Sequence, residues 1–198
     1  MATQPSEAAQ LAQFEQATEN LKKLVRNRVQ QTLSKSARLG ETKISEVKNV
    51  DDFAYDHWMA FIMISGSSIR IMLKIHFNTT TAIDMLTHRP RNKDTDRVQR
   101  MAMDFMKEQC NLMAGALKGS LNNAKIVTGL SIPLVTRGFD EAVFSDKVDR
   151  SKINDVWRLD WDEGAVTCSS VLEILDWNDL VNFQVESEDE DEDDGVFL

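Results

Sequence analysis

Large apolar side chains occupy every second position of residues 69–77, and mostly polar side chains lie between them. This repeat of two predicts a β-strand, because alternate side chains of a strand point to opposite faces of the sheet. The apolar set is Ile69, Ile71, Leu73, Ile75 and Phe77, and the intervening set is Arg70, Met72, Lys74 and His76. We expect His76 on the exposed face. A sheet with one apolar face has to be covered by other elements, and this requirement constrains the fold more than any other feature.

The strand predicted at residues 69–77 has a partner directly before it in the chain. Residues 57–64 form a short and nearly continuous apolar run, and the small polar residues 65–68 interrupt it. The two segments therefore predict a β-hairpin. Residues 154–162 and 165–175 predict a second hairpin by the same reasoning.

Two segments, 6–34 and 95–122, show helical periodicity of their apolar residues. Residues 79–88 are expected to form a short helix, because hydroxyl side chains at its start can cap it. The run 124–136 is strand-like, and Pro133 within it cannot donate a ladder hydrogen bond. This run is therefore expected at a sheet edge or in a bulge. Helices combined with hairpins indicate an α+β fold, in which an antiparallel sheet packs against long helices within a single domain.

The net charge of −9 is concentrated near the end of the sequence. Residues 186–194 hold eight carboxylates and no base, and removing them from the 32 acidic residues leaves 24 against 23 basic residues. Because like charges repel and bury nothing, we expect residues 184–198 to form a disordered acidic tail, a spacer or a tether for a basic partner surface. The nearly neutral remainder argues against nucleic-acid binding.

Several features indicate a cytoplasmic protein without a bound cofactor. The sequence has no run of about 18 apolar residues that could span a membrane, and its start lacks the basic and apolar regions of a signal peptide. Cys110 and Cys168 are expected to be reduced thiols. His57, His76 and His88 form no metal-ligand spacing with cysteines or carboxylates, so no metal is expected in this chain.

The segment 95–122 has distinct apolar and polar faces when it is drawn as a helix with about 100° per residue. The apolar arc is centred near Val98 and is expected to face the core, with Cys110 at its border. It comprises Ala102, Phe105, Met106, Leu112, Met113, Ala116 and Leu117. Four residues cluster within about 60° on the opposite side: Asp104, Glu108, Asn111 and Gly115.

A glycine on the polar face needs an explanation, because glycine in a helix interior costs about 0.5–1 kcal/mol relative to alanine. Since Gly115 is not on the predicted core face, it makes no room for packing inside the protein. Its missing side chain would let another molecule approach the helix backbone beside Glu108 and Asn111. The same pattern also fits a solvated helix face on which the glycine is tolerated.

The motif Glu108-x-x-Asn111-x-x-x-Gly115, followed by the segment Gly129–Pro133, resembles the CheC/CheX/FliY family of chemotaxis phosphatases, and the CheX-like branch in particular. The resemblance covers residues 14–183. It leaves residues 1–13 as an extension of the first helix and the acidic tail as an addition. The order of predicted helices and strands also agrees with this family.

The resemblance implies a phosphatase that removes the phosphoryl group from the aspartate of a phosphorylated CheY-type response regulator. The regulator would carry both the acyl phosphate and Mg²⁺. Asn111 would orient the attacking water through its carboxamide, and Glu108 would pair with the regulator's active-site lysine. We expect Asp104, Gly115 and Lys118 to contact the regulator as well. The alternative is a module of the same fold that sequesters the regulator without catalysis.

One site per chain is expected. Relatives of the CheC type carry two such motifs, but the first predicted helix offers only Glu-x-x-Thr and Glu-x-x-Lys, at Glu15 and Glu19. Glu46-x-x-Asn49 has the right spacing, yet it lies in a stretch without helical periodicity and lacks the glycine. A single motif agrees with the CheX-like branch, and this resemblance implies a possible homodimer through the sheet.

Overall fold

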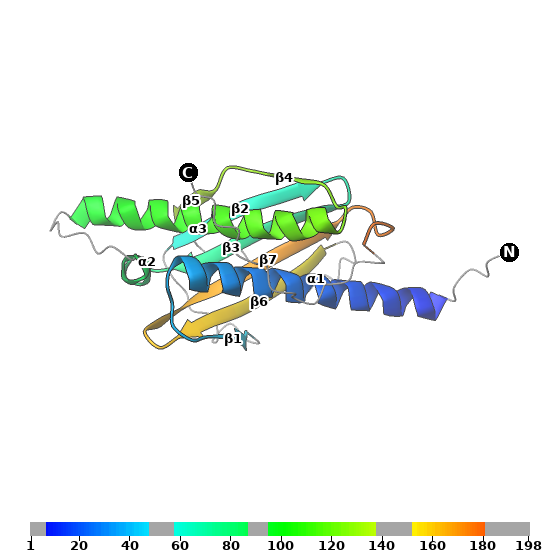
Figure 1. The fold of residues 1–198 in the computed structure, drawn as a ribbon, viewed down its shortest axis with the longest axis horizontal. Helices are drawn as coiled ribbons and strands as arrows, with labels where there is room; N and C mark the ends of the chain where they lie inside the picture. Colours follow the sequence, from blue (N-terminus) through cyan, green and yellow to red (C-terminus); the bar gives the residue numbers. More distant parts are fainter. Residues whose placement is uncertain (1–6, 48–57, 87–94, 138–151, 181–198) are drawn as a thin grey trace.

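The computed structural model describes residues 7–47, 58–86, 95–137 and 152–180 (Figure 1). The elements in chain order are α1 (Glu7–Ser36), β1 (Thr42–Glu46), β2 (Trp58–Gly66), β3 (Ile69–Phe77), α2 (Thr79–Met85), α3 (Thr95–Asn123), β4 (Thr128–Leu130), β5 (Leu134–Arg137), β6 (Lys152–Trp161) and β7 (Gly164–Ile174). None of these helices is long and apolar enough to span a membrane. The expected acidic tail, His57 and His88 lie outside the described residues.

The described strands form one antiparallel sheet in the order β1-β6-β7-β3-β2-β4, and β5 also pairs with β2. The two long helices lie side by side across the sheet (Figure 1). α1 contacts β1 and β6, whereas α3 contacts β2, β4 and β5 near the other edge. The expected α+β fold with an antiparallel sheet in a single domain is therefore confirmed.

Both predicted hairpins are present. In the first, Ile62 of β2 lies opposite Leu73 of β3; in the second, Trp157 of β6 lies opposite Cys168 of β7. All four side chains are fully buried. The apolar positions of the predicted alternation therefore form the inner face of the sheet.

The structure contains one strand that periodicity did not predict. β1 pairs with β6 along its whole length, from Thr42 opposite Trp161 to Glu46 opposite Trp157. Its sequence, TKISE, has a single large apolar residue, because an edge strand buries little of its surface. The composition of β1 therefore does not predict a strand, and β1 is recognised only by its pairing with β6.

The opposite edge of the sheet contains the expected bulge. Leu130, the last residue of β4, lies opposite Ile64, and Leu134, the first residue of β5, lies opposite Phe61. Three residues on the edge thus correspond to two on β2, which defines a bulge with one extra residue. Pro133 is one of the three, in a position where its missing N–H costs no regular ladder bond.

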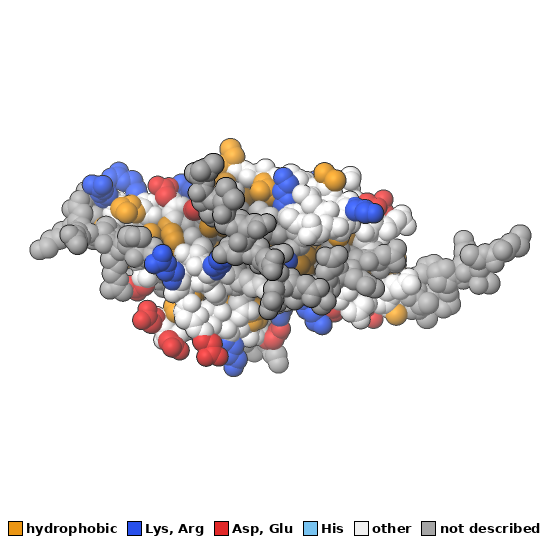
Figure 2. Space-filling view, in the orientation of Figure 1, with side chains coloured by type: hydrophobic (Ala, Val, Ile, Leu, Met, Phe, Trp, Pro, Cys, Tyr) orange, Lys and Arg blue, Asp and Glu red, His pale blue; other side chains and the backbone are white. Residues whose placement is uncertain are grey.

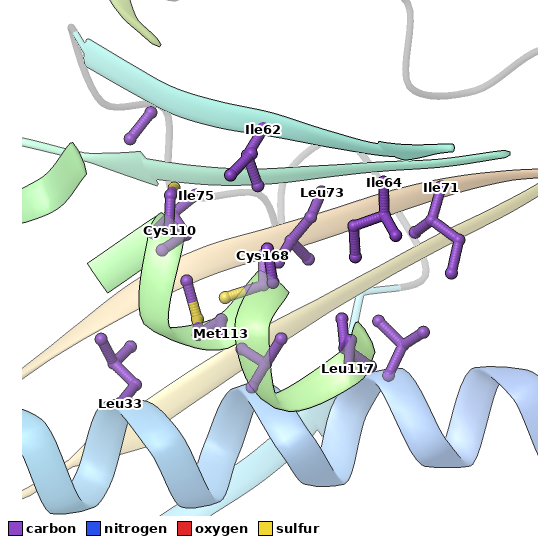
Figure 3. Close-up of a cluster of buried hydrophobic side chains, with 14 of the residues drawn as sticks. Leu33, Ile62, Ile64, Ile71, Leu73, Ile75, Cys110, Met113, Leu117 and Cys168 are labelled. Carbon is purple, nitrogen blue, oxygen red and sulfur yellow. The ribbon is translucent and has the colours of Figure 1, made fainter. Parts of the chain in front are cut away.

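The core lies between the two long helices and the inner face of the sheet. Figure 3 shows Leu33 of α1 and Met113 and Leu117 of α3 next to side chains from the strands. The strand residues labelled there are Ile62, Ile64, Ile71, Leu73, Ile75 and Cys168. Helix positions that face the sheet are therefore fixed by packing, and the opposite positions of each helix are left for solvent or partners.

His76 is buried, with 7% of its surface exposed, so the expectation of an exposed histidine is wrong. It lies opposite Met59 and Thr167, on the sheet face away from the helices, as the alternation predicts. Thr167 is also fully buried on this face. Periodicity identifies the face on which a side chain lies, but it does not tell whether that face is covered at that point.

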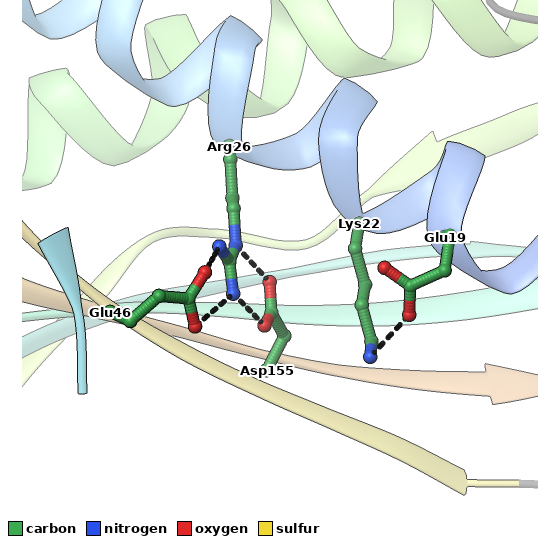
Figure 4. Close-up of polar contacts among 5 residues, drawn as sticks. All are labelled: Glu19, Lys22, Arg26, Glu46 and Asp155. Atoms are coloured by element: carbon green, nitrogen blue, oxygen red, sulfur yellow. Dashed lines mark hydrogen bonds and ion pairs between the residues drawn. The ribbon is translucent and has the colours of Figure 1, made fainter. Parts of the chain in front are cut away.

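A partly buried ion cluster joins α1 to the sheet (Figure 4). The guanidinium of Arg26 donates two hydrogen bonds to the carboxylate of Asp155, at 2.8 and 2.5 Å, and two more to the carboxylate of Glu46 of β1. Arg26 also stacks over the ring of Trp157, 5.7 Å from its centroid. Hydrogen bonding to Asp155 is the main cause that raises the pKa of Arg26. The cluster fixes how α1 lies across β1 and β6.

Candidate functional site

The buried side of α3 differs from the predicted one. The stripe that contacts the core consists of Ala102, Met106, Gln109, Cys110, Met113, Ala114, Leu117 and Leu121. Its centre lies about 90° around the helix from Val98. Leu112, placed in the core by the sequence, is 41% exposed, and Cys110, placed at the border, is fully buried. Periodicity alone treats every apolar residue as equally suited to the core. In the fold the polar Gln109 is also buried, because its side-chain oxygen accepts a hydrogen bond from Ser36 of α1.

The polar strip predicted on α3 is present on the outer side of the helix. Asp104, Glu108, Asn111 and Gly115 are all exposed, and Lys118 is half-buried. Glu108 and Asn111 are separated by about 4.5 Å along the helix axis, and Gly115 follows about 6 Å further. One rigid helix therefore presents a carboxylate, a carboxamide and a gap in a single row.

Glu108 and Asn111 have no hydrogen-bond or ion-pair partner among the residues that the structure describes. Asp104 differs, because its carboxylate accepts from the ammonium of Lys107 at 3.0 Å, one turn along the same helix. The expectation that Asn111 faces solvent is confirmed. An unpaired carboxylate and an unpaired amide on a packed helix are free to bind a partner without first breaking a contact within these residues.

Gly115 is not required for packing inside the chain. A Cβ built at this position meets no heavy atom within 4 Å, and the same holds for Gly119 one turn later. Both glycines thus weaken the helix without serving the core. The open space above Gly115 lies between Asn111 and Gly119, where an approaching surface could reach the helix backbone.

The other glutamates considered in the sequence, on β1 and α1, do not form a second polar strip of this kind. Glu46 lies on strand β1, where it pairs with Arg26, and Asn49 lies outside the described residues. On α1, Glu19 pairs with Lys22 at 2.9 Å (Figure 4). Within the described part of the chain, the combination of glutamate, asparagine and glycine at helical spacing occurs only on α3.

Nucleophilic chemistry by the cysteines is disfavoured by their environment. Burial raises the pKa of Cys110 from 9.0 to about 12, and it raises the pKa of Cys168 as well. Both thiols therefore remain protonated and inaccessible at neutral pH. Within the described residues, no group of three or more histidine, cysteine, aspartate or glutamate side chains could hold a metal ion.

The comparisons with known proteins agree with this fold. CheX from Vibrio vulnificus superimposes with a TM-score of 0.58 at 18% identity, covering 76% of this chain and 97% of that one. A CheC-like superfamily protein from Shewanella sp. PV-4 gives 0.54 at 16% identity, covering 75% and 94%. A CheX–CheY–BeF₃–Mg²⁺ complex from Borrelia burgdorferi gives 0.59 at 12% identity, covering 77% and 96%.

No protein-family model matches the chain, and no curated protein matches it either. At identities of 12–18% the structural matches establish the fold. The protein has the fold of CheX and CheC-like chemotaxis proteins, as the motif on α3 indicated. A fold does not determine an activity, which depends on the residues of the site, here the polar strip on α3.

Proposed function

We propose that this protein is a phosphatase that hydrolyses the phosphoryl-aspartate of a CheY-type response regulator in the cytoplasm. The observation that carries the proposal is the row formed by Glu108, Asn111 and Gly115 on the outer side of α3, in a fold of the CheX type. In the matched Borrelia burgdorferi structure, a CheX is in complex with CheY, BeF₃ and Mg²⁺. The receiver domain of a CheY-type regulator is therefore the partner that we expect for this chain.

Asn111 would orient the attacking water. Phosphoryl transfer requires little covalent chemistry from the protein, and most of the acceleration comes from an in-line nucleophile and from neutralised charge. A carboxamide can accept a hydrogen bond from water through its oxygen and donate through its nitrogen. Because it is neutral, it adds no repulsion near the phosphoryl oxygens, as a carboxylate would.

Glu108 would fix the position of α3 on the regulator by pairing with the active-site lysine of that protein. One turn separates it from Asn111, so a contact at Glu108 determines where the carboxamide lies. Asp104 and Lys118 flank the row and would contact the regulator near its edges. Since the described residues of this chain include no metal-holding group, Mg²⁺ would be bound by the regulator, where it neutralises phosphoryl charge.

The proposal is tested by following the decay of phosphoryl-aspartate on a CheY-type regulator in Mg²⁺, with and without the protein. We expect the wild type to accelerate decay and Asn111→Ala to lose about a hundredfold of that acceleration, because a misplaced nucleophile costs this much. Asn122→Ala is the matched control, since Asn122 is an exposed asparagine on the same helix beyond the row. It should retain full activity.

The same experiment separates catalysis from sequestration. Binding of the regulator without accelerated decay would favour the module that docks and does not hydrolyse. Undiminished activity of a folded Asn111→Ala protein would contradict the assignment of the water-orienting residue. Because Asn111 is exposed and unpaired among the described residues, its loss should leave thermal unfolding unchanged.

A further inference from the structure

Exposed apolar side chains border the row on α3 along both of its long sides. Figure 2 shows hydrophobic side chains over the part of the surface where Figure 1 places α3, β4 and β5. Several large apolar residues there are more than one-third exposed, namely Met101, Leu112, Leu130 and Ile132. Single exposed apolar residues are ordinary, but two borders along one polar row are not explained by chance scatter.

The first border lies on the side of α3 that faces α1. Gln109 marks that side, because it is hydrogen-bonded to Ser36 of α1. Leu112 lies about 60° around the helix between Gln109 and Gly115, and Met101 lies about 40° from Gly115 on the same side. Leu112 is 41% exposed and Met101 is 37% exposed. The two side chains form an apolar margin next to Glu108.

The second border is the sheet edge on the other side of α3. After α3 the chain turns back, and β4 and β5 lie alongside the helix and contact it. Leu130 lies opposite the buried Ile64, so its side chain is on the helix-covered face of the sheet. Ile132 follows in the bulge and is 81% exposed. Asn111 lies on this side of the row, about 40° from Gly115.

The edge itself is poorly suited to pairing with a strand of a second molecule. Pro133 interrupts the row of N–H donors. The bulge also disrupts the backbone ladder, since the N–H of Met63 donates to the hydroxyl of Ser131 at 2.9 Å instead of to a carbonyl. Edges broken in this way resist strand addition. The exposed leucine and isoleucine are therefore better suited to insertion of their side chains into a partner than to extension of the sheet.

We propose that these two borders, Met101 with Leu112 and Leu130 with Ile132, are the apolar part of the docking surface for the receiver domain, with Ile132 as its main anchor. This inference rests on the proposed function. Apolar residues around a polar centre exclude bulk water from it, and interfaces place such residues around their energetically important contacts. Here they would surround the carboxamide of Asn111 and leave only the positioned water next to the phosphoryl group.

The test measures the affinity of the 198-residue protein for a CheY-type receiver domain activated with beryllofluoride and Mg²⁺. Ile132→Ser should weaken binding by about tenfold, the loss expected for a buried interface anchor. Val127→Ser is the matched control, because Val127 is 78% exposed and precedes β4, so that it lies outside both borders. It should bind within twofold of the wild type.

The outcomes distinguish the two proposals. Wild-type binding that Ile132→Ser leaves unchanged would overturn the docking surface and leave the phosphatase proposal standing. The absence of both binding and hydrolysis by the wild type, across a panel of receiver domains, would overturn both. If Ile132→Ser instead converted a dimer to a monomer without altering regulator binding, the border would belong to a contact between two copies, which also overturns this inference.

Discussion

Gly115 lowers the stability of helix α3 but leaves open space at the surface beside Asn111. No atom of the chain occupies the space that its side chain would fill, so the position is not constrained from within. A side chain there would instead project beside Asn111, into the space that a docking regulator would need. At the scale of single residues, the candidate site is therefore defined as much by the missing side chain as by the carboxylate and the carboxamide.

Substitutions at Gly115 should separate stability from activity. Gly115→Ala should raise the free energy of unfolding by about 0.5–1 kcal/mol, since alanine favours the helix and meets no neighbour. Gly115→Leu should also fold stably but lower phosphatase activity by about a hundredfold, because the side chain displaces α3 from the regulator. Urea unfolding and phosphoryl decay are the two measurements.

Gly119 provides the comparison for this series. It is exposed on the same helix, and a Cβ built there also meets nothing within 4 Å. Gly119→Leu should change the free energy of unfolding about as much as Gly115→Leu does. It should lower phosphatase activity less than Gly115→Leu, since Gly119 lies a turn further from Asn111. Equal activity of Gly115→Leu and the wild type would contradict the role proposed for this glycine.

The two long helices have different roles at the scale of elements. α3 exposes the row of candidate site residues, whereas α1 covers the other half of the sheet and is tied to it by Arg26. The Asp155 carboxylate in this cluster is only 5% exposed, and its partner Arg26 is 17% exposed. Since α3 packs against α1, the position of α3 depends on how firmly α1 is held.

Removal of the Arg26 side chain should destabilise the fold strongly. Arg26→Ala leaves the buried Asp155 without its main partner, and uncompensated buried charges cost about 3–5 kcal/mol. Urea unfolding measures this change. The matched control is Lys22→Ala, which removes the more exposed pair with Glu19 and should cost less than about 1 kcal/mol. If Arg26→Ala lowered the free energy of unfolding as little as Lys22→Ala does, the role of Arg26 in anchoring α1 to the sheet would be contradicted.

At the scale of the whole molecule, the described residues share one core, and both cysteines are in it. Figure 3 shows Cys110 on α3 and Cys168 on β7 within the same cluster of buried side chains. Burial is the main cause that raises the pKa of each thiol, and the neighbouring Cys110 contributes to the shift at Cys168. Neither thiol can ionise or react unless the packing between the helices and the sheet opens.

Thiol alkylation should therefore report global unfolding. At pH 8 iodoacetamide should label neither cysteine in the native protein and both in concentrated urea, with one midpoint detected by mass spectrometry. Because the folded pKa of Cys110 exceeds its ordinary value of 9.0, the contribution of this thiol to stability is complete below pH 9. It should be lost as the pH rises towards 12. Labelling of either cysteine before unfolding would contradict the single core.

The sequence by itself determined the fold class, both hairpins, the two long helices and the exposure of Glu108, Asn111 and Gly115. These features depend on the period of apolar residues, which each segment carries locally. Only the tertiary structure decided that Leu112 is exposed and Cys110 buried, that His76 is covered, and that a polar edge segment pairs as β1. It also brought β4 and β5, the strands on either side of Ile132, into contact with α3. The physical reason is that burial and neighbourhood depend on which elements pack together, and a local pattern contains no information about its neighbours in space.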